Sequence, residues 1–278
     1  MEQYILKASG EKELFSEDKI YDSLLKAGAS PSLASKTIKE VQTKLNGEID
    51  TDKVYNSILE KLTNEEPRIA LKYSLKRAIM KLGPTGYLFE KYIAKILQEY
   101  GYATEVGRIV NGYCVSHEID VIAIQNNQHF MVECKYHNQP GTRSDIKIAL
   151  YIYARFLDVE RVWKLNKGHE SMFHQAWLVT NTKCTSEAIK YASCMNMRII
   201  AWQYPKEASL EYLIESKDLY PITILPSLET DSIEKLNSLG ILVAKELLKY
   251  SQDDLMKTLS TSRNISHKIF EEVNLLFK

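Results

Sequence analysis

The chain has 278 residues, of which 45% are hydrophobic and 26% are charged. This length and composition are those of a globular protein with about two domains, which excludes disordered, collagen-like and low-complexity classes. Lys and Arg together number 36, as do Asp and Glu, so the net charge is zero. A chain with no basic excess is not a histone-like protein, and any contact with nucleic acid must come from a local patch.

The sequence also indicates where the protein works. No signal-peptide pattern opens the chain, and no apolar run approaches the roughly 20 residues of a membrane span. The four cysteines form no CxxC pair. We therefore expect a cytoplasmic protein with no membrane contact.

Residues 1–83 predict a small hairpin followed by helices. Two short apolar runs, Tyr4-Ile5-Leu6 and Leu14-Phe15, flank a glycine turn. Ser16-Glu17-Asp18 has the pattern of a helix start, with acidic residues in the first turn. Two or three further helices are expected near residues 32–46, 51–63 and 67–82.

Residues 84–220 alternate helices and strands. A helix is expected at 88–100, and three strands follow at 103–110, 114–124 and 129–136. The remaining elements are a helix at 145–157, a strand at 176–180, a helix at 186–195 and a strand at 198–202. This order predicts an α/β domain with a mixed central β-sheet.

Residues 221–278 predict a small all-α tail, with Pro221 and Pro226 at the joint. Leu239-Gly240-Ile241 fits the turn of a helix-hairpin-helix, whose amides and helix N-terminus can hold a DNA phosphate. A plain helical bundle is the alternative. The helices are expected near 231–238, 242–249, 253–259 and 266–276.

Two adjacent strands of the middle section form a hairpin with a polar turn. If Asn126-Asn127 is a two-residue loop, Val121 lies opposite Val132 and Ala123 lies opposite Phe130. These pairs form an apolar face, which predicts that this face of the hairpin packs on the core.

The other face of this hairpin carries charge. In the same register Asp120 lies opposite Glu133, and Glu118 lies opposite Lys135. Facing carboxylates destabilise a sheet unless something holds them, and Mg²⁺ is typically bound by one or two carboxylates with waters and phosphate oxygens. Lys135 shares this face, where an ammonium can orient a nucleophile beside a phosphate. The alternative is a solvated face with an ordinary Glu118–Lys135 ion pair.

Three segments together carry a resemblance to a known family: Gly86-Tyr87-Leu88-Phe89-Glu90, Glu118-Ile119-Asp120-Val121-Ile122-Ala123 and Val132-Glu133-Cys134-Lys135. This pattern resembles the PD-(D/E)xK nuclease superfamily and, within it, the Mrr-like restriction endonucleases, over about residues 86–220. The resemblance implies that Asp120 and Glu133 bind metal, that Lys135 is catalytic and that Glu90 of the first helix assists. Glu118 stands where many Mrr-like sequences carry glycine.

A second resemblance covers about residues 3–83. Ile5-Leu6-Lys7-Ala8-Ser9-Gly10, Phe15-Ser16-Glu17-Asp18-Lys19-Ile20 and the helix end at Tyr73-Ser74-Leu75-Lys76-Arg77 are similar to the ATP cone. The ATP cone is the nucleotide-sensing module of ribonucleotide reductases. No Walker-type glycine loop is present, which favours sensing of ATP or dATP over ATP-driven work. The alternative is a cone used only for packing or dimerisation.

The resemblance to the ATP cone also implies its binding residues. Nucleotide contacts are expected at Lys7 and Lys19, which can converge on phosphates, and further at Glu13, Ser16 and Thr51. Ala8-Ser9 replaces the usual Arg-Asp after the first lysine.

The stretch 143–167 has the local basic excess nearest this candidate site. Such a run can follow a phosphate backbone, although a basic helix face is often only solvated. Its acidic residues are Asp145, Asp158 and Glu160, and its basic residues are Arg143, Lys147, Arg155, Arg161, Lys164 and Lys167.

The sequence thus predicts three domains: an ATP cone at 1–83, a nuclease domain at 84–220 and a tail at 221–278. The favoured function is a nucleotide-regulated, Mg²⁺- or Mn²⁺-dependent DNA endonuclease of the restriction type. The alternatives are a non-catalytic DNA-binding regulator on a nuclease fold and a repair nuclease acting on branched DNA. Cutting both strands usually needs two active sites, so a homodimer is expected.

Overall fold

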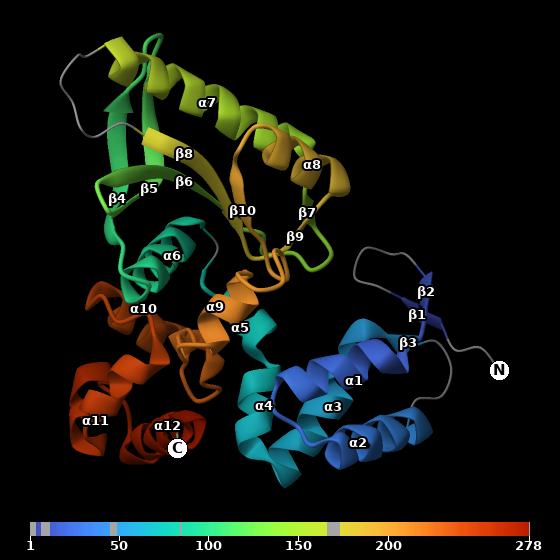
Figure 1. Ribbon diagram of the computed structural model, residues 1–278. Helices are drawn as coiled ribbons and strands as arrows, with labels where there is room; N and C mark the ends of the chain where they lie inside the picture. The colour runs from blue at the N-terminus through green and yellow to red at the C-terminus, as the bar shows by residue number, and fades with distance from the viewer. Residues whose placement is uncertain (1–3, 7–11, 45–48, 84, 166–172, 278) are drawn as a thin grey trace. The chain divides into compact units, whose positions relative to one another are not determined.

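The structure of the protein is a computed structural model that describes residues 4–6, 12–44, 49–83, 85–165 and 173–277 (Figure 1). Its contacts divide the chain into two compact units. One unit joins residues 1–79 with residues 222–278, and the other contains residues 80–221. The helical sections at the two ends of the sequence therefore fold together, and the α/β section forms a unit of its own.

A five-stranded mixed sheet forms the centre of the unit 80–221, as the sequence predicts. Its strand order is β10-β8-β6-β5-β4. Neighbours among β4, β5 and β6 pair antiparallel, whereas β8 pairs parallel with both β6 and β10. The strands are β4 (Ala103–Asn111), β5 (Ser116–Gln125), β6 (Gln128–Lys135), β8 (Phe173–Thr180) and β10 (Arg198–Ile200).

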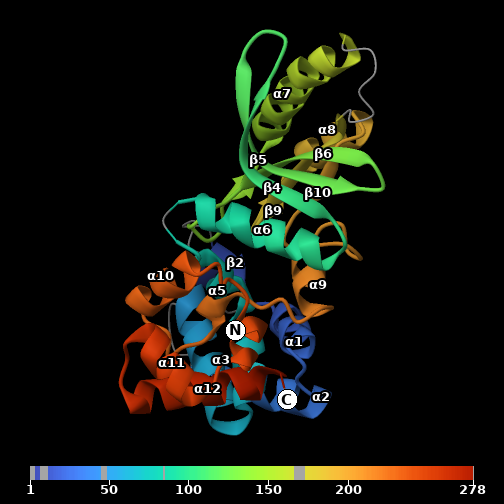
Figure 2. The ribbon, with the colours of Figure 1, turned by 90° about the vertical axis from the view of Figure 1, so that its left-hand side faces the viewer.

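Helices cover both faces of this sheet. Helix α6 (Tyr87–Glu99) lies on one face, while α7 (Ile146–Leu165) and α8 (Ser186–Cys194) lie on the other (Figure 1, Figure 2). Helix α7 runs past the expected end at residue 157 because its buried stripe continues to Val159. A short parallel pair, which sequence periodicity is too local to reveal, joins β7 (Arg143–Ser144) to β9 (Lys183–Cys184).

The N-terminal elements of the other unit include a small sheet of order β2-β1-β3. The predicted hairpin is present as the antiparallel pair of β1 (Tyr4–Leu6) and β2 (Lys12–Leu14), and its glycine turn lies outside the described residues. Strand β3 (Ile49–Asp50) pairs parallel with β1 and was not expected, because two residues are too short to show a period-2 pattern.

Among the described residues of the N-terminal section, two helices lie between β2 and β3 and three follow β3. The expected helix at 67–82 is divided at Ser74 into two shorter helices. Leu24, Ile58 and Leu62 are fully buried between the helices. The helices are α1 (Glu17–Lys26), α2 (Pro31–Lys44), α3 (Thr51–Glu65), α4 (Pro67–Tyr73) and α5 (Leu75–Met80).

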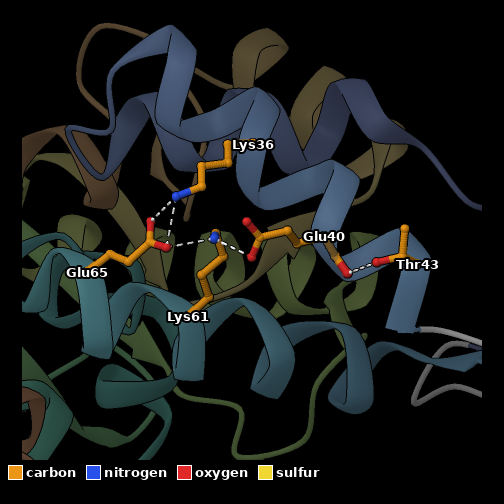
Figure 3. Close-up of polar contacts among 5 residues, drawn as sticks. All are labelled: Lys36, Glu40, Thr43, Lys61 and Glu65. Atoms are coloured by element: carbon orange, nitrogen blue, oxygen red, sulfur yellow. Dashed lines mark hydrogen bonds and ion pairs between the residues drawn. The ribbon is translucent and has the colours of Figure 1, made fainter.

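A buried lysine joins α2 to α3. The side chain of Lys61 is 6% exposed, and its ammonium donates to Glu40 and, at 2.9 Å, to Oε1 of Glu65 (Figure 3). Lys36 also contacts Glu65, at 3.1 Å, but its side chain is 58% exposed. The two lysines therefore share one carboxylate in very different surroundings.

Replacing Lys61 by methionine is expected to lower the free energy of unfolding of this unit by about 1–3 kcal/mol, because two carboxylates lose a buried partner. The matched variant Lys36→Met removes an exposed charge from the same cluster and is expected to change stability by less than about 1 kcal/mol. Urea denaturation followed by circular dichroism measures both. Equal effects of the two variants would contradict the role of burial.

The C-terminal elements complete this unit. Thr223 donates a hydrogen bond from Oγ1 to the carbonyl of Ala78 at 2.6 Å, which ties the tail to α5. The helix expected at 242–249 is a 3₁₀-helix beginning at Ala244, because Glu246 accepts the two preceding amides. No helix in the described ranges is long and apolar enough to cross a membrane. The tail elements are η1 (Ile222–Ile224), α10 (Thr230–Ser238), η2 (Ala244–Lys249), α11 (Gln252–Leu259) and α12 (Arg263–Phe277).

The tail repeats one helix-ending turn. Gly240 after α10 and Ser260 after α11 both adopt left-handed conformations, with φ of 75° and 53°. In both turns this residue donates to the carbonyl three residues earlier, and the next amide donates to the carbonyl five residues earlier. The sequence hides the repeat because serine stands in the second turn. The amides of Leu242 and Val243, after the first turn, bond Glu246, and DNA binding by the tail stays a prediction.

Candidate active site

The hairpin of β5 and β6 has the register that the sequence predicts up to one point. Asn126 and Asn127 form its loop with φ of 51° and 59°, the left-handed conformations that a type I′ turn requires. The pairs run from Gln125–Gln128 at the loop to Val121 and Val132. Beyond this pair the two strands separate.

Asp120 lies where the two strands separate. The sequence predicts that Asp120 pairs with Glu133 across the hairpin, but the strand pairing ends one residue earlier, at Val121 and Val132. The cause is a hydrogen bond: the amide of Cys134 donates to Oδ2 of Asp120 at 2.7 Å. That amide is consequently unavailable to the β5 backbone, whereas the pairing of β6 with β8 on its other side continues to Lys135. The Asp120 carboxylate thereby sits between the strand ends, with its second oxygen outside this bond.

Glu133 is the most deeply buried acid of the site. Its side chain is 9% exposed and accepts a hydrogen bond at Oε2 from Nη1 of Arg155 in α7, at 2.5 Å. The other guanidinium nitrogen, Nη2, donates to the main-chain oxygen of Glu118. Oε1 of Glu133 is buried and has no hydrogen-bond partner within the described residues.

The first turn of α6 brings Glu90 to this group. Burial, together with the charges of Asp120 and Glu118, raises the pKa of Glu90 to about 7. Burial likewise raises the pKa of Glu133 to about 8, with the Asp120 carboxylate adding to the effect and Arg155 opposing it. Burial also raises the pKa of Asp120. Mutually interacting carboxyls with raised pKa values are typical of functional sites.

These residues fit a divalent cation. Within the described ranges, no three His, Cys, Asp or Glu side chains form a group that could hold a metal alone. Mg²⁺ does not need one, because it keeps several waters and takes phosphate oxygens with one or two carboxylates. Asp120 and Glu133 each keep one oxygen outside their bonds to the chain, and that of Glu133 is buried without a partner. The orphaned oxygen is the observation that favours a metal here.

A cavity of about 360 Å³ opens beside this group. Lys135, at the end of β6, lines it and is exposed. Among the described residues Lys135 forms no ion pair with Glu118, so the alternative of an ordinary cross-strand pair is not realised. The wall opposite β6 is one face of α7, with Lys147, Ile148, Tyr151, Ile152 and Arg155.

Three of the six basic residues in the stretch 143–167 are engaged within the chain. Arg155 bonds the site, Arg161 lies over the ring of Tyr113 at 3.7 Å, and Lys164 pairs with Glu160 at 2.8 Å. The role of Arg155 was missed, although its place beside the buried stripe of α7 is a signal that helical periodicity could have shown. The remaining basic residues of the stretch 143–167 are Arg143 and Lys147, both exposed, and Lys167, which lies outside the described residues.

A second contact from α7 fixes the turn between β4 and β5. The carboxylate of Asp158 accepts from the amides of Cys114 at 2.8 Å and Val115 at 3.3 Å, and it contacts Nε2 of His117 at 2.8 Å. The His117 hydrogen bond, together with these amides, lowers the pKa of Asp158 to about 2. This clamp holds the start of β5, the strand that carries Asp120.

The clamp leaves no room for a side chain at Gly112. A Cβ built there would overlap the Asp158 carboxylate and lie 2.5 Å from the carbonyl oxygen of Val115. Gly112→Ala is expected to lower the free energy of unfolding by about 1–3 kcal/mol, the usual cost of overpacking. Thermal melting of the variant measures this loss. An unchanged melting temperature would mean that the turn does not hold Asp158 in this way.

The expected nucleotide-binding residues lie on several elements of the N-terminal sheet and its helices. Lys7 lies outside the described residues. Glu13 is in β2, opposite Ile5. Ser16 caps α1 and accepts the amide of Lys19 at 3.3 Å, which occupies part of its bonding capacity.

Thr51 begins α3, directly after β3. The parallel register places Asp50 beside Leu6, so α3 begins at the C-terminal end of β1. Helix α1 follows β2, whose last residue, Leu14, pairs with Tyr4 at the other end of β1. The two helix starts thus leave opposite ends of one three-residue strand.

Comparison with known proteins assigns family profiles to three stretches of the chain. Three family profiles match the chain: "ATP cone domain" over residues 3–82, "Restriction endonuclease" of the Mrr type over residues 84–210, and "AF1548-like, C-terminal" over residues 220–277. An uncharacterized protein of Archaeoglobus fulgidus (strain ATCC 49558 / DSM 4304 / JCM 9628 / NBRC 100126 / VC-16) is 39% identical over 163 residues, which are 59% of this chain and 87% of that protein. Residues 84–210 of the chain belong to the Mrr-like restriction-endonuclease family.

A solved structure supports the same fold for this Mrr-like protein. The crystal structure titled as that of a protein of unknown function, AF1548, is 36% identical, with a TM-score of 0.57. The match covers 68% of this chain and 97% of that chain. The expected fold class is therefore confirmed, and the Mrr-like protein carries an ATP cone ahead of its nuclease domain.

Proposed function

We propose that this Mrr-like protein is a DNA endonuclease of the restriction type that hydrolyses phosphodiester bonds with Mg²⁺ or Mn²⁺ and is regulated by a bound nucleotide. The observation that carries the proposal is the pair Asp120 and Glu133. Each has one oxygen bonded to the chain and one left over, and that of Glu133 is buried without a partner.

Each residue of the site would have a separate role in phosphodiester hydrolysis. Asp120 and Glu133 would hold the cation, which when bound polarises the scissile phosphate and lowers the pKa of a bound water. Lys135, exposed at the cavity wall, would donate to a phosphate oxygen and stabilise charge that develops there. Glu90, with its pKa raised to about 7, can accept or return a proton near neutral pH.

The ATP cone supports regulation by a nucleotide. We assign ATP or dATP to the N-terminal sheet and its helix starts, with contacts at Lys7, Glu13, Ser16, Lys19 and Thr51. We also retain the functional division into a sensor at 1–83, a nuclease at 84–220 and a tail at 221–278. A homodimer would supply the second active site needed to cut both strands.

The decisive experiment is cleavage of supercoiled plasmid by the full chain with Mg²⁺ or Mn²⁺, with and without ATP or dATP, and with EDTA. Plain, methylated and branched DNA serve as substrates. We expect metal-dependent nicking or linearisation that EDTA abolishes and that nucleotide changes. Glu133→Ala locates the reaction, and Glu207→Ala, which removes an exposed acid from the same unit, is the matched control.

The outcomes separate the competing functions. Cleavage confined to branched DNA would favour a repair nuclease over a restriction enzyme. Nucleotide and DNA binding without cleavage of any substrate would contradict the proposal and favour a regulator that has kept the nuclease fold.

A further inference from the structure

Arg155 lines the cavity beside Glu133, and the proposed reaction gives it no role. It comes from α7, and its side chain is 11% exposed beside a Glu133 side chain that is 9% exposed. An arginine and a glutamate so far removed from water need good geometry and further hydrogen bonds. Arg155 has both, because its second nitrogen bonds the main-chain oxygen of Glu118.

The two bonds of Arg155 fix both the guanidinium and the acid that it holds. The oxygen of Glu118 belongs to β5, so one planar group links α7, β5 and β6. A carboxylate held at Oε2 cannot rotate freely, so Oε1 has a defined direction. Oε1 is also the oxygen that is buried without a partner.

Asp120 is held in a parallel manner. Its Oδ2 accepts the amide of Cys134 at 2.7 Å, and its other oxygen is outside this bond. In each acid, therefore, one oxygen is fixed by an N–H of the chain and one remains for a ligand. The fixing group is a backbone amide for Asp120 and the side chain of Arg155 for Glu133.

We propose that Arg155 is a positioning residue that holds Oε2 of Glu133 and thereby presents Oε1 to a divalent cation shared with Asp120. This inference rests on the proposed function. The opposite role for Arg155 is that of a latch, in which its own guanidinium cation competes with the metal for the carboxylate of Glu133. The two roles predict changes of opposite sign when Arg155 is replaced.

Binding of Mn²⁺ to the full chain without DNA, measured by electron paramagnetic resonance and by calorimetry, gives that sign independently of cleavage. In Arg155→Met we expect the dissociation constant of Mn²⁺ to rise about 10- to 100-fold, the usual effect of losing a group that orients a metal ligand. Arg155→Lys, which keeps the charge and one point of contact, is expected to restore part of the loss. Arg161→Met is the matched control, because it removes an arginine of the same helix that lies over Tyr113 and away from the site.

Each result has a defined meaning. Unchanged or tighter Mn²⁺ binding in Arg155→Met, with binding still weakened in Asp120→Asn, overturns the positioning role alone. Absence of Mn²⁺ binding in the unmodified protein overturns both this inference and the proposed function. Circular dichroism checks folding, and if Arg155→Met is unfolded, Arg155→Gln, which keeps one N–H donor, takes its place with the same expected sign.

Discussion

Replacing Glu133 by glutamine is expected to lower phosphodiester cleavage by at least about a thousandfold while making the metal-free protein more stable at pH 8. The loss of activity follows because a metal ion contributes several kcal/mol of transition-state stabilisation, and each 1.4 kcal/mol is tenfold in rate. A neutral amide oxygen is a poorer ligand for that ion than a carboxylate, so most of this contribution is lost.

The gain in stability follows from the raised pKa of Glu133. Burial raises this pKa to about 8 in the folded chain from an ordinary value of 4.5. Between these values the folded state holds a proton that the unfolded state has released, so the free energy of unfolding falls as pH rises. Glutamine cannot titrate and avoids this loss, which at about 1.4 kcal/mol per pKa unit amounts to about 4 kcal/mol at pH 8.

Urea denaturation in EDTA at pH 5 and pH 8 measures the stability change, and plasmid cleavage measures the activity. The control is Glu207→Gln, an exposed acid in the same unit, which is expected to alter neither. If the stability of Glu133→Gln falls between pH 5 and pH 8 as much as that of the unmodified protein, Glu133 is not the group responsible.

Binding of Mn²⁺ is expected to tighten about fifty-fold between pH 6 and pH 8. The metal needs ionised carboxylates, and at pH 6 a Glu133 with a pKa of about 8 carries a proton that binding must displace. One displaced proton corresponds to about a tenfold change in affinity per pH unit, which levels off near the pKa. Glu90, with a pKa of about 7, adds to the dependence at the acidic end.

Calorimetry in two buffers of different ionisation enthalpy counts the protons released with each Mn²⁺. We expect about one proton or more at pH 6 and fewer at pH 8.5. In Glu90→Gln the release near pH 8 is expected to remain, because Glu133 is unchanged. Affinity that does not vary with pH, with no proton release, would show that these carboxyls are not the metal ligands.

The local features of the site could be predicted from the sequence. Asn126 and Asn127 favour a type I′ turn, so the register of Val121 and Val132 could be predicted from two neighbouring strands. The order of helices and strands fixed the α/β class, because each element has its own hydrophobic period. The Mrr-like and ATP-cone patterns could also be recognised, because the residues of each motif lie close together in the sequence.

The other features of the site depend on contacts between residues that are far apart in the chain. Arg155 meets Glu133 across 22 residues, and Asp158 clamps the start of β5 from 44 residues beyond Cys114. No local pattern encodes which face of α7 turns toward which strand end. The register itself was predictable only as far as Val121, because the carboxylate of Asp120 captures an amide that strand pairing would have used.

The joining of the two terminal sections was also decided by packing. Nothing in the sequence of either section indicates that the two pack together. Residues 1–79 and 222–278 nevertheless form one unit, with contacts such as that of Thr223 with Ala78. Helices bury their apolar stripes against whatever surface is available, and the period of a stripe predicts that it is buried but not its partner. Hydrophobic periodicity therefore predicts the helices and strands of this protein. Contacts between distant residues place Arg155 beside Glu133, and this makes Glu133 a candidate metal ligand with one oxygen held and one without a partner among the described residues.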